Sequence, residues 1–241
     1  SRKGKVRRVE AGTTLQGLPA ENPLAGMIDH TLLKPDATQE QIAKLCQEAL
    51  DNGFGAVCVN SYWVPLCANY LRGSSVKVGS TVGFALGANA TKAKTSEAKK
   101  AIKQGAREID MVMNVGALKS GDLAAFAEDI RKVTRVCHRR NALLKVILET
   151  CLLTEDEKVT ACLIAKEVGA DFVKTSTGFN GPGATVEDVR LMRSVVGPNM
   201  GVKAAGGVRT YEDAMRMIEA GATRIGTSSG IKIIGEAAQQ S

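Results

Sequence analysis

The chain has 241 residues, of which 44% are hydrophobic and only 4% are aromatic. This length suits one large domain with a full core, and the many small aliphatic residues favour helices packed on a sheet over a β-sandwich. The formal charge of +7 lies mostly at the start, because residues 1–10 carry five basic and one acidic residue (5 − 1 = +4), which leaves +3 for the other 231 residues. This near-neutral body argues against nucleic acid as a partner, and we interpret residues 1–21 as a basic, mobile extension before a single folded domain at 22–241.

The distribution of cysteine, histidine and apolar residues indicates location and cofactors. The six cysteines form no C-x-x-C pair, and only His30 and His138 offer imidazole ligands, so the sequence suggests neither a zinc site nor a disulfide framework. No apolar segment approaches the ~20 residues that cross a bilayer, and the polar N-terminus lacks the apolar region of a signal peptide. We therefore expect a cytoplasmic protein with no metal, no organic cofactor and no membrane partner.

Strand-like and helix-like segments alternate along the chain past residue 20. Capping signals, two of them complete capping boxes, predict helix N-termini at Thr38, Thr154, Thr185 and Thr210. Short β-branched runs between the helices predict eight strands, at 27–29, 56–59, 76–82, 108–112, 143–148, 171–174, 201–205 and 224–226. Glycines that end helices, at 53, 105, 169 and 221, are 52, 64 and 52 residues apart, which corresponds to roughly two βα units each.

Eight βα units in one uninterrupted domain predict a (β/α)8 TIM barrel, whose active site is built at the C-terminal ends of the strands. An open, doubly wound sheet is the alternative. That fold usually brings a G-x-G-x-x-G turn after its first strand, and this sequence has none there.

Three of the predicted strands contain a charged residue: Asp110, Lys174 and Lys203. An unpaired buried charge costs several kcal/mol or is neutralised by a pKa shift, so charges inside strands suggest chemistry. Strand alternation places Lys174 on one face with Phe172, and Lys203 on one face with Ala205. If these faces point into the barrel, the three charged groups meet near its top. Alternatively, the lysines end their strands and extend into solvent.

Such convergence predicts a nucleophilic lysine. As an ammonium, Lys203 would lower the pKa of Lys174, and a neutral amine attacks carbonyls to form a Schiff base. Asp110 would stay ionised and move protons.

Glycine-rich turns after the last three strands predict an anion site. Gly206-Gly207 follows the seventh strand, the segment from Gly226 through Ser228 and Ser229 follows the eighth, and Thr177-Gly178 follows the sixth. Barrels of this kind commonly bind phosphate on the loops after the seventh and eighth strands, through backbone N–H groups and a helix N-terminus.

Several segments together resemble the deoxyribose-phosphate aldolase family of class I aldolases. They are Ile28–Pro35, Val57–Asn60, Glu108–Asn114, Val146–Thr150, Gly169–Gly178 and Val202–Arg209, and they span nearly the whole chain. The resemblance implies reversible cleavage of 2-deoxy-D-ribose 5-phosphate to glyceraldehyde 3-phosphate and acetaldehyde, without a cofactor. It also implies a small phosphorylated sugar and aldehydes as substrates, and we expect a homo-oligomer, either a dimer or a tetramer.

The resemblance also assigns roles to residues. It implies that Lys174 forms the Schiff base, that Lys203 activates it and that Asp110 relays protons. Asp29, Cys58 and Thr177 would border the substrate, and its phosphate would be held by Gly178, Gly206, Gly207, Gly226, Ser228 and Ser229. Two features depart from some family members: Phe179 replaces a basic residue, and the last tyrosine is Tyr211 rather than one in a C-terminal tail.

Two other functions are compatible with the motifs. The chain could be another lysine-based barrel aldolase, such as a transaldolase, which substrate profiling would distinguish. It could also be a phosphate-binding barrel retained for regulation or for nucleic-acid association through its basic tail. Binding of nucleic acid would weaken steeply with salt, whereas only an aldolase would be trapped by borohydride in the presence of acetaldehyde.

Overall fold

Eight parallel strands close into a barrel in the computed structural model of this chain, which describes residues 23–240. Each strand pairs with its neighbours in sequence, and the eighth pairs with the first. The strands are β1 (Ile28–Leu32), β2 (Ala56–Val59), β3 (Lys77–Val82), β4 (Glu108–Val112), β5 (Leu143–Ile147), β6 (Phe172–Lys174), β7 (Gly201–Ala205) and β8 (Arg224–Thr227). The closed ring confirms the predicted (β/α)8 barrel and excludes an open sheet. The predicted extension at 1–21 lies outside the described residues.

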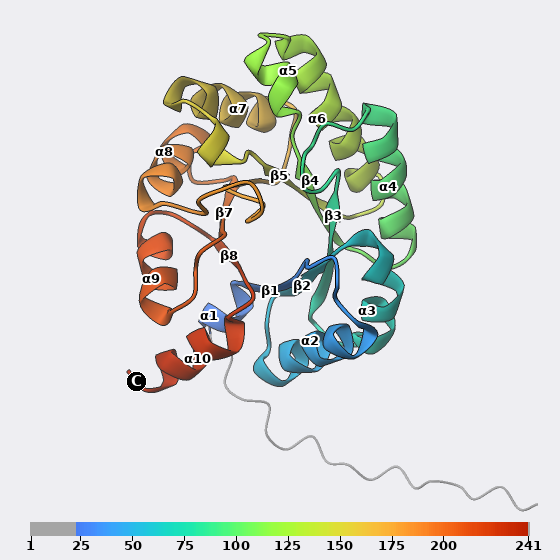
Figure 1. The fold of residues 1–241 in the computed structure, drawn as a ribbon, viewed down its shortest axis with the longest axis vertical. Coiled ribbons are helices and arrows are strands. Elements are labelled where there is room, and N and C mark those ends of the chain that lie inside the picture. The colour runs from blue at the N-terminus through green and yellow to red at the C-terminus, as the bar shows by residue number, and fades with distance from the viewer. Residues whose placement is uncertain (1–22, 241) are drawn as a thin grey trace, which may run out of the picture.

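Figure 1 shows the helices arranged around the strands. They are α1 (Pro23–Gly26), α2 (Gln39–Asn52), α3 (Val64–Tyr70), α4 (Thr91–Lys103), α5 (Val115–Lys119), α6 (Leu123–His138), α7 (Glu155–Glu167), α8 (Val186–Val196), α9 (Tyr211–Glu219) and α10 (Gly230–Ala238). Two 3₁₀ turns, η1 (Ser61–Trp63) and η2 (Thr150–Leu152), follow β2 and β5. One helix therefore follows most strands, as a βα repeat requires.

The predicted helix starts are confirmed at the level of single hydrogen bonds. Thr38, Thr154 and Thr210 form complete capping boxes, and the side chain of Thr185 also accepts a backbone N–H of its helix. Gly53 ends α2 with φ +64°, the left-handed conformation that favours glycine. Helix α4 has no such signal in the sequence, because its first turn lacks an acidic residue and its N-cap makes no side-chain hydrogen bond.

The strand boundaries agree with the prediction to within one residue except at the end of β1, which continues to Leu32 rather than ending at Asp29. Its added residues pair with β2, where Leu32 lies opposite Val59. The strand thereby reaches the C-terminal end of the barrel, which brings the segment after it close to the ends of β7 and β8.

Strand alternation decides which side chains fill the barrel interior. In β4, Ile109 and Met111 belong to the apolar core, whereas Glu108 and Asp110 alternate with them and are buried on the opposite face. The same alternation holds in β7, where Val202 and Ala204 join the apolar core and Lys203 does not. The interior of the barrel is therefore partly filled by charged groups.

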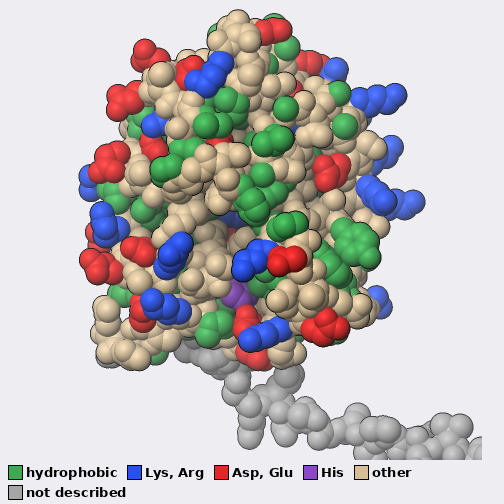
Figure 2. All heavy atoms as spheres, in the orientation of Figure 1, with side chains coloured by type: hydrophobic (Ala, Val, Ile, Leu, Met, Phe, Trp, Pro, Cys, Tyr) green, Lys and Arg blue, Asp and Glu red, His purple; other side chains and the backbone are tan. Residues whose placement is uncertain are grey.

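Charged side chains on the outside are mixed in sign. Figure 2 shows acidic and basic side chains interspersed over the face in view, rather than gathered into one basic patch. Within the described part of the chain, no helix is both long and apolar enough to cross a membrane.

Candidate active site

A cavity of ≈ 380 Å³ opens where β6, β7 and β8 end, with the segment after β1 on its other side. It is lined by Lys174, Thr177, Gly178, Phe179, the run from Ala205 to Arg209, Gly226, Thr227, Ser228 and the run from Thr31 to Lys34. A larger hollow of ≈ 760 Å³ lies beside Tyr62 and Trp63 and is lined mainly by η1, α3 and α4. None of the predicted site residues lines that larger hollow, so the smaller cavity is the candidate site.

At the foot of the cavity, two lysines share one carboxylate oxygen. Nζ of Lys174 and Nζ of Lys203 each lie 2.8 Å from Oδ2 of Asp110. The two amines are therefore at most 2.8 + 2.8 = 5.6 Å apart. Sheet register produces this arrangement, because Lys174 and Lys203 are direct partners across β6 and β7. The convergence predicted from strand alternation is thus present, and neither lysine extends into bulk solvent, since both are almost fully buried.

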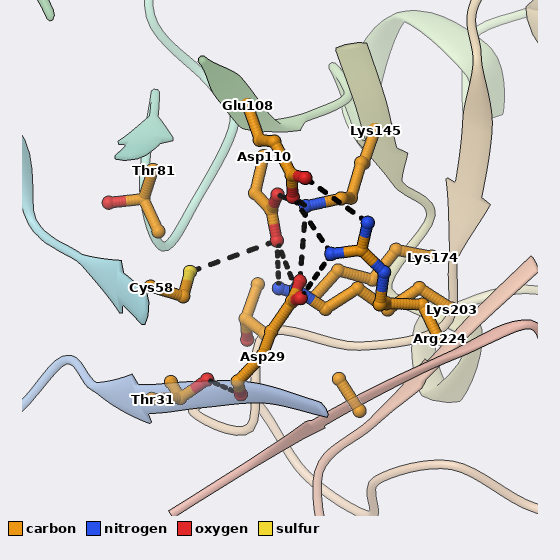
Figure 3. A network of polar contacts seen from close by, with 12 residues as sticks. Asp29, Thr31, Cys58, Thr81, Glu108, Asp110, Lys145, Lys174, Lys203 and Arg224 are labelled. Carbon is orange, nitrogen blue, oxygen red and sulfur yellow. Dashed lines mark hydrogen bonds and ion pairs between the residues drawn. The ribbon is translucent and has the colours of Figure 1, made fainter. Parts of the chain in front are cut away.

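Four more charged groups extend this cluster, as Figure 3 shows. Lys145 donates to Asp29 and to Asp110, both at 3.1 Å, and also to Glu108. Arg224 reaches both oxygens of Glu108 at 3.1 Å and also contacts Asp29, which in turn accepts from Lys203. We call these seven residues the charged cluster: Asp29, Glu108, Asp110, Lys145, Lys174, Lys203 and Arg224.

Electrostatics within the charged cluster favour the ionised forms of Asp110 and Lys203. Burial alone would raise the pKa of Asp110, but the ammonium groups of Lys145, Lys174 and Lys203 hold it well below its usual range. Burial alone would lower the pKa of Lys203, but the carboxylates of Asp110 and Asp29 outweigh it and raise the value. Lys203 is therefore an ammonium at neutral pH, as the sequence predicts, and Asp110 is a carboxylate.

The predicted substrate residues fall into three groups by position. Thr177, Gly178, Gly206, Gly207, Gly226 and Ser228 line the cavity. Asp29 and Cys58 lie in or beside the charged cluster beneath it, with Sγ of Cys58 3.9 Å from Asp110. Ser229 does not line the cavity; it occupies the N-cap position of α10 without a side-chain cap hydrogen bond, and its N–H donates to Oγ1 of Thr227.

The loop after β7 exposes backbone to the cavity. Gly206 and Gly207 both have positive φ, +86° and +81°, a succession that side-chain-bearing residues rarely adopt. Consecutive backbone groups in such turns form concavities that suit anions. Lys34 and Arg209, which the sequence analysis did not single out, line the same cavity and add two cations.

Glu149 holds the loop after β6 in place. This residue is buried and has φ +57°, an uncommon conformation for a residue other than glycine. Its carboxylate accepts from the backbone and hydroxyl of Thr177 and from Nδ2 of Asn180. The partners of this carboxylate are residues of the loop after β6 rather than a lysine.

Glu108, Lys145 and Arg224 are the members of the charged cluster that sequence reasoning missed. Lys145 lies between Leu144 and Val146 in an apolar strand, so the same rule that singled out Lys174 could have found it. Arg224 is the first residue of β8, a position at which a basic side chain is usually expected to be exposed to solvent. No group of three or more His, Cys, Asp or Glu side chains within residues 23–240 is arranged to hold a metal ion.

A buried lysine that lines a cavity, beside a carboxylate and a second ammonium, is compatible with Schiff-base chemistry. The fold and this cluster are typical of a barrel enzyme. Residues 24–235 match the model of the DeoC/LacD family of aldolases, and the chain belongs to that family.

Comparison with individual proteins agrees with the family. The chain is similar to a deoxyribose-phosphate aldolase of Thermococcus kodakarensis, with 63% identity over 213 residues, 88% of this chain and 95% of the relative. It is 62% identical to one of Brevibacillus brevis over 207 residues, 86% of this chain and 93% of the relative. Its structure resembles that of a tetrameric deoxyribose phosphate aldolase of Aeropyrum pernix, with a TM-score of 0.85 and 32% identity over 91% of this chain and 94% of that one.

Proposed function

We propose that this chain is a class I aldolase that reversibly cleaves 2-deoxy-D-ribose 5-phosphate to D-glyceraldehyde 3-phosphate and acetaldehyde through a Schiff base on Lys174. The observation that carries the proposal is the position of Lys174, which lines the cavity and also contacts the charged cluster through Asp110. The activity follows that of the T. kodakarensis and B. brevis relatives, to which the chain is more than 60% identical.

The reaction begins with the neutral amine of Lys174, which attacks the C1 carbonyl of the open-chain sugar. Loss of water gives a protonated imine, and this cation accepts the electron pair of the C2–C3 bond as that bond breaks. The hydroxyl proton at C3 leaves to a base, and glyceraldehyde 3-phosphate departs. The remaining enamine takes up a proton through water held by Asp110, and hydrolysis then releases acetaldehyde and the free lysine.

The phosphate is assigned to the glycine-rich side of the cavity. Gly178, Gly206, Gly207, Gly226 and Ser228 line that side, and Lys34 and Arg209 supply positive charge on the same cavity. Phe179 is half exposed at the rim and packs edge to face against Phe84, with ring centroids 5.2 Å apart. We therefore expect Lys34 and Arg209 to replace the cation that some family members carry at the position of Phe179.

The decisive experiment is borohydride reduction in the presence of deoxyribose 5-phosphate or acetaldehyde, followed by mass analysis of peptides. The adduct should map to Lys174 and should be absent from the peptides that carry Lys145 and Lys203, which serve as buried-lysine controls in the same molecule. An adduct on Lys203 with Lys174 unmodified would reverse the role assignment. Profiling against ketose donors tests the alternative of a transaldolase.

Assembly and location complete the proposal. We propose a homo-oligomer, either a dimer or a tetramer, and the tetrameric A. pernix relative supports the larger assembly. Light scattering coupled to gel filtration distinguishes these states. We also propose a cytoplasmic location, which agrees with the thiol form of all six cysteines.

A further inference from the structure

The charged cluster contains one more cation than it contains carboxylates. Its cations are Lys145, Lys174, Lys203 and Arg224, and its carboxylates are Asp29, Glu108 and Asp110. With every group ionised, the cluster carries 4 − 3 = +1. All but Arg224 are almost completely buried, and Arg224 keeps only 14% of its side chain exposed. A net charge inside a barrel is costly, so the cluster favours the loss of one proton.

The contacts indicate which group loses that proton. Lys145 contacts three carboxylates, and Lys203 and Arg224 contact two each, whereas Lys174 contacts Asp110 alone. An arginine is not deprotonated in proteins. Lys174 is therefore the least compensated cation, and it is the only member of the charged cluster among the residues that line the cavity, where its proton can leave.

A buried lysine outside the charged cluster serves as a reference. Lys94 donates to Asp129 at 2.6 Å between α4 and α6, and it too has a single carboxylate partner. Burial lowers the pKa of Lys94 despite that partner, whereas the pKa of Lys145, with three carboxylates, is raised well above its usual value. Among the buried lysines of this protein, one carboxylate partner thus leaves the pKa below its usual value, whereas several raise it.

We propose that Arg224 and Glu108 are positioning residues that set the charge balance of the cluster, so that the surplus positive charge is relieved by deprotonation of Lys174. This inference rests on the proposed function. Arg224 acts at a distance, from the start of β8, through its paired contacts with Glu108 and Asp29. The guanidinium of Arg224 also lies over the ring of Phe172, with Cζ 5.7 Å from the ring centroid, and this contact helps to hold the guanidinium in position.

The charged and titratable groups that face Lys174 come from six strands and two loops. They are Asp29, Cys58, Glu108, Asp110, Lys145, Lys203 and Arg224 around and below the amine, with Lys34 and Arg209 at the cavity wall. Only Arg224 and Glu108 belong to the charged cluster without contacting Lys174, Asp110 or Lys203. Substitutions there change the charge of the cluster and leave the contacts of the reacting lysine in place.

The test is a charge-balance cycle measured as the pH dependence of kcat/KM and of borohydride trapping on Lys174. Arg224→Met leaves three cations and three carboxylates, so both profiles should shift to higher pH. Glu108→Gln leaves four cations and two carboxylates, so both pH profiles should shift to lower pH. Two unit charges about 10 Å apart at an effective dielectric constant near 20 correspond to a shift of roughly one pH unit.

The double variant, Arg224→Met with Glu108→Gln, restores a net charge of +1 in the cluster. Its pH profiles should return close to those of the unmodified protein. Arg224→Lys keeps the charge and should leave the pH midpoints in place even if the rate falls. Arg131→Met removes a cation of the same type from the outer face of α6 and is the matched control, for which no shift is expected.

Unchanged midpoints with lower rates, shifts of the two single variants in the same direction, or a double variant further displaced than either would overturn the inference. Circular dichroism confirms folding, and either single variant that folds tests the direction by itself. Failure of the proposed function can be distinguished from failure of the charge-balance inference. If the proposed function is wrong, the unmodified protein itself will show neither turnover nor the Lys174 adduct.

Discussion

Two regions of this molecule bury lysines completely, and they do so in different ways. Between α4 and α6, Lys94 and Asp129 form an isolated pair of one cation and one carboxylate. Inside the barrel, four cations and three carboxylates form the charged cluster, one member of which lines a cavity. The pair is balanced and closed to solvent, whereas the cluster is unbalanced and opens at Lys174.

The difference teaches that burial of a charge does not by itself indicate a reactive site. Lys94 and Lys174 each have one carboxylate partner at hydrogen-bonding distance and are similarly buried. Only Lys174 has a second ammonium within 5.6 Å, from 2.8 + 2.8 Å through Asp110, and a cavity for a substrate. The surroundings of a buried lysine, rather than its depth, therefore distinguish a nucleophile from a structural ion pair.

The largest effect is expected at the nucleophile. Lys174→Ala should remove the borohydride adduct and lower kcat/KM by at least about 1,000-fold, because no other amine lies on the cavity beside Asp110. Lys94→Met is the matched control, since it removes an equally buried lysine and should leave kcat/KM of the folded protein unchanged. Equal losses of kcat/KM in the two variants would erase the distinction between the regions.

The isolated pair should matter for stability. Asp129→Asn leaves Lys94 without its carboxylate, and removal of one partner from a buried pair typically costs about 3–5 kcal/mol. Urea unfolding should detect this loss in the free energy of unfolding, with kcat per folded molecule unchanged. The double variant Lys94→Met with Asp129→Leu should recover much of the stability, because apolar side chains of similar size tolerate that site.

The charged cluster should respond to loss of one ammonium through the pH profile. Lys203→Leu leaves three cations and three carboxylates, so the proton on Lys174 is better compensated and harder to lose. Turnover at neutral pH should fall at least about tenfold, and part of it should return in alkaline buffer. A low rate with an unmoved pH profile would mean that Lys203 only positions substrate or water.

The smallest effect is expected at the rim of the cavity, where solvent screens charge. Ser228→Asp places a carboxylate on the wall assigned to the phosphate and should raise KM for deoxyribose 5-phosphate about tenfold more than KM for free deoxyribose. Ser229→Asp is the control one residue along, because Ser229 occupies the N-cap position of α10 and does not line the cavity. Equal losses on both substrates from Ser228→Asp would argue against a phosphate site on this wall.

Much of the candidate site was predictable because it follows from strand periodicity. Asp110, Lys174 and Lys203 interrupt apolar strands at positions that share an inward face, and the structure brings their charged ends together. The same rule applied to Lys145 would have found the centre of the charged cluster. Arg224 could not be found this way, because a cation at the start of a strand is compatible with either solvent or the interior.

The local signals in the sequence determined the elements of this protein. Capping residues at Thr38, Thr154, Thr185 and Thr210, and alternation in short strands, specify structure through contacts a few residues apart, so a single sequence contains them in full. The count of eight βα units then indicated the barrel. The outcome at Ser229 shows the limit, since membership of a loop does not decide which side chain of that loop reaches a cavity.

Only the tertiary structure decided the charge balance. Arg224 and Glu108 are 116 residues apart, and Lys203 and Asp29 are 174 apart, yet each pair is in contact. Whether a buried lysine keeps its proton depends on how many carboxylates surround it, and that number is set by closure of the barrel and by the register of eight strands. Coulomb energies depend on distance in space, which spacing along the chain does not contain.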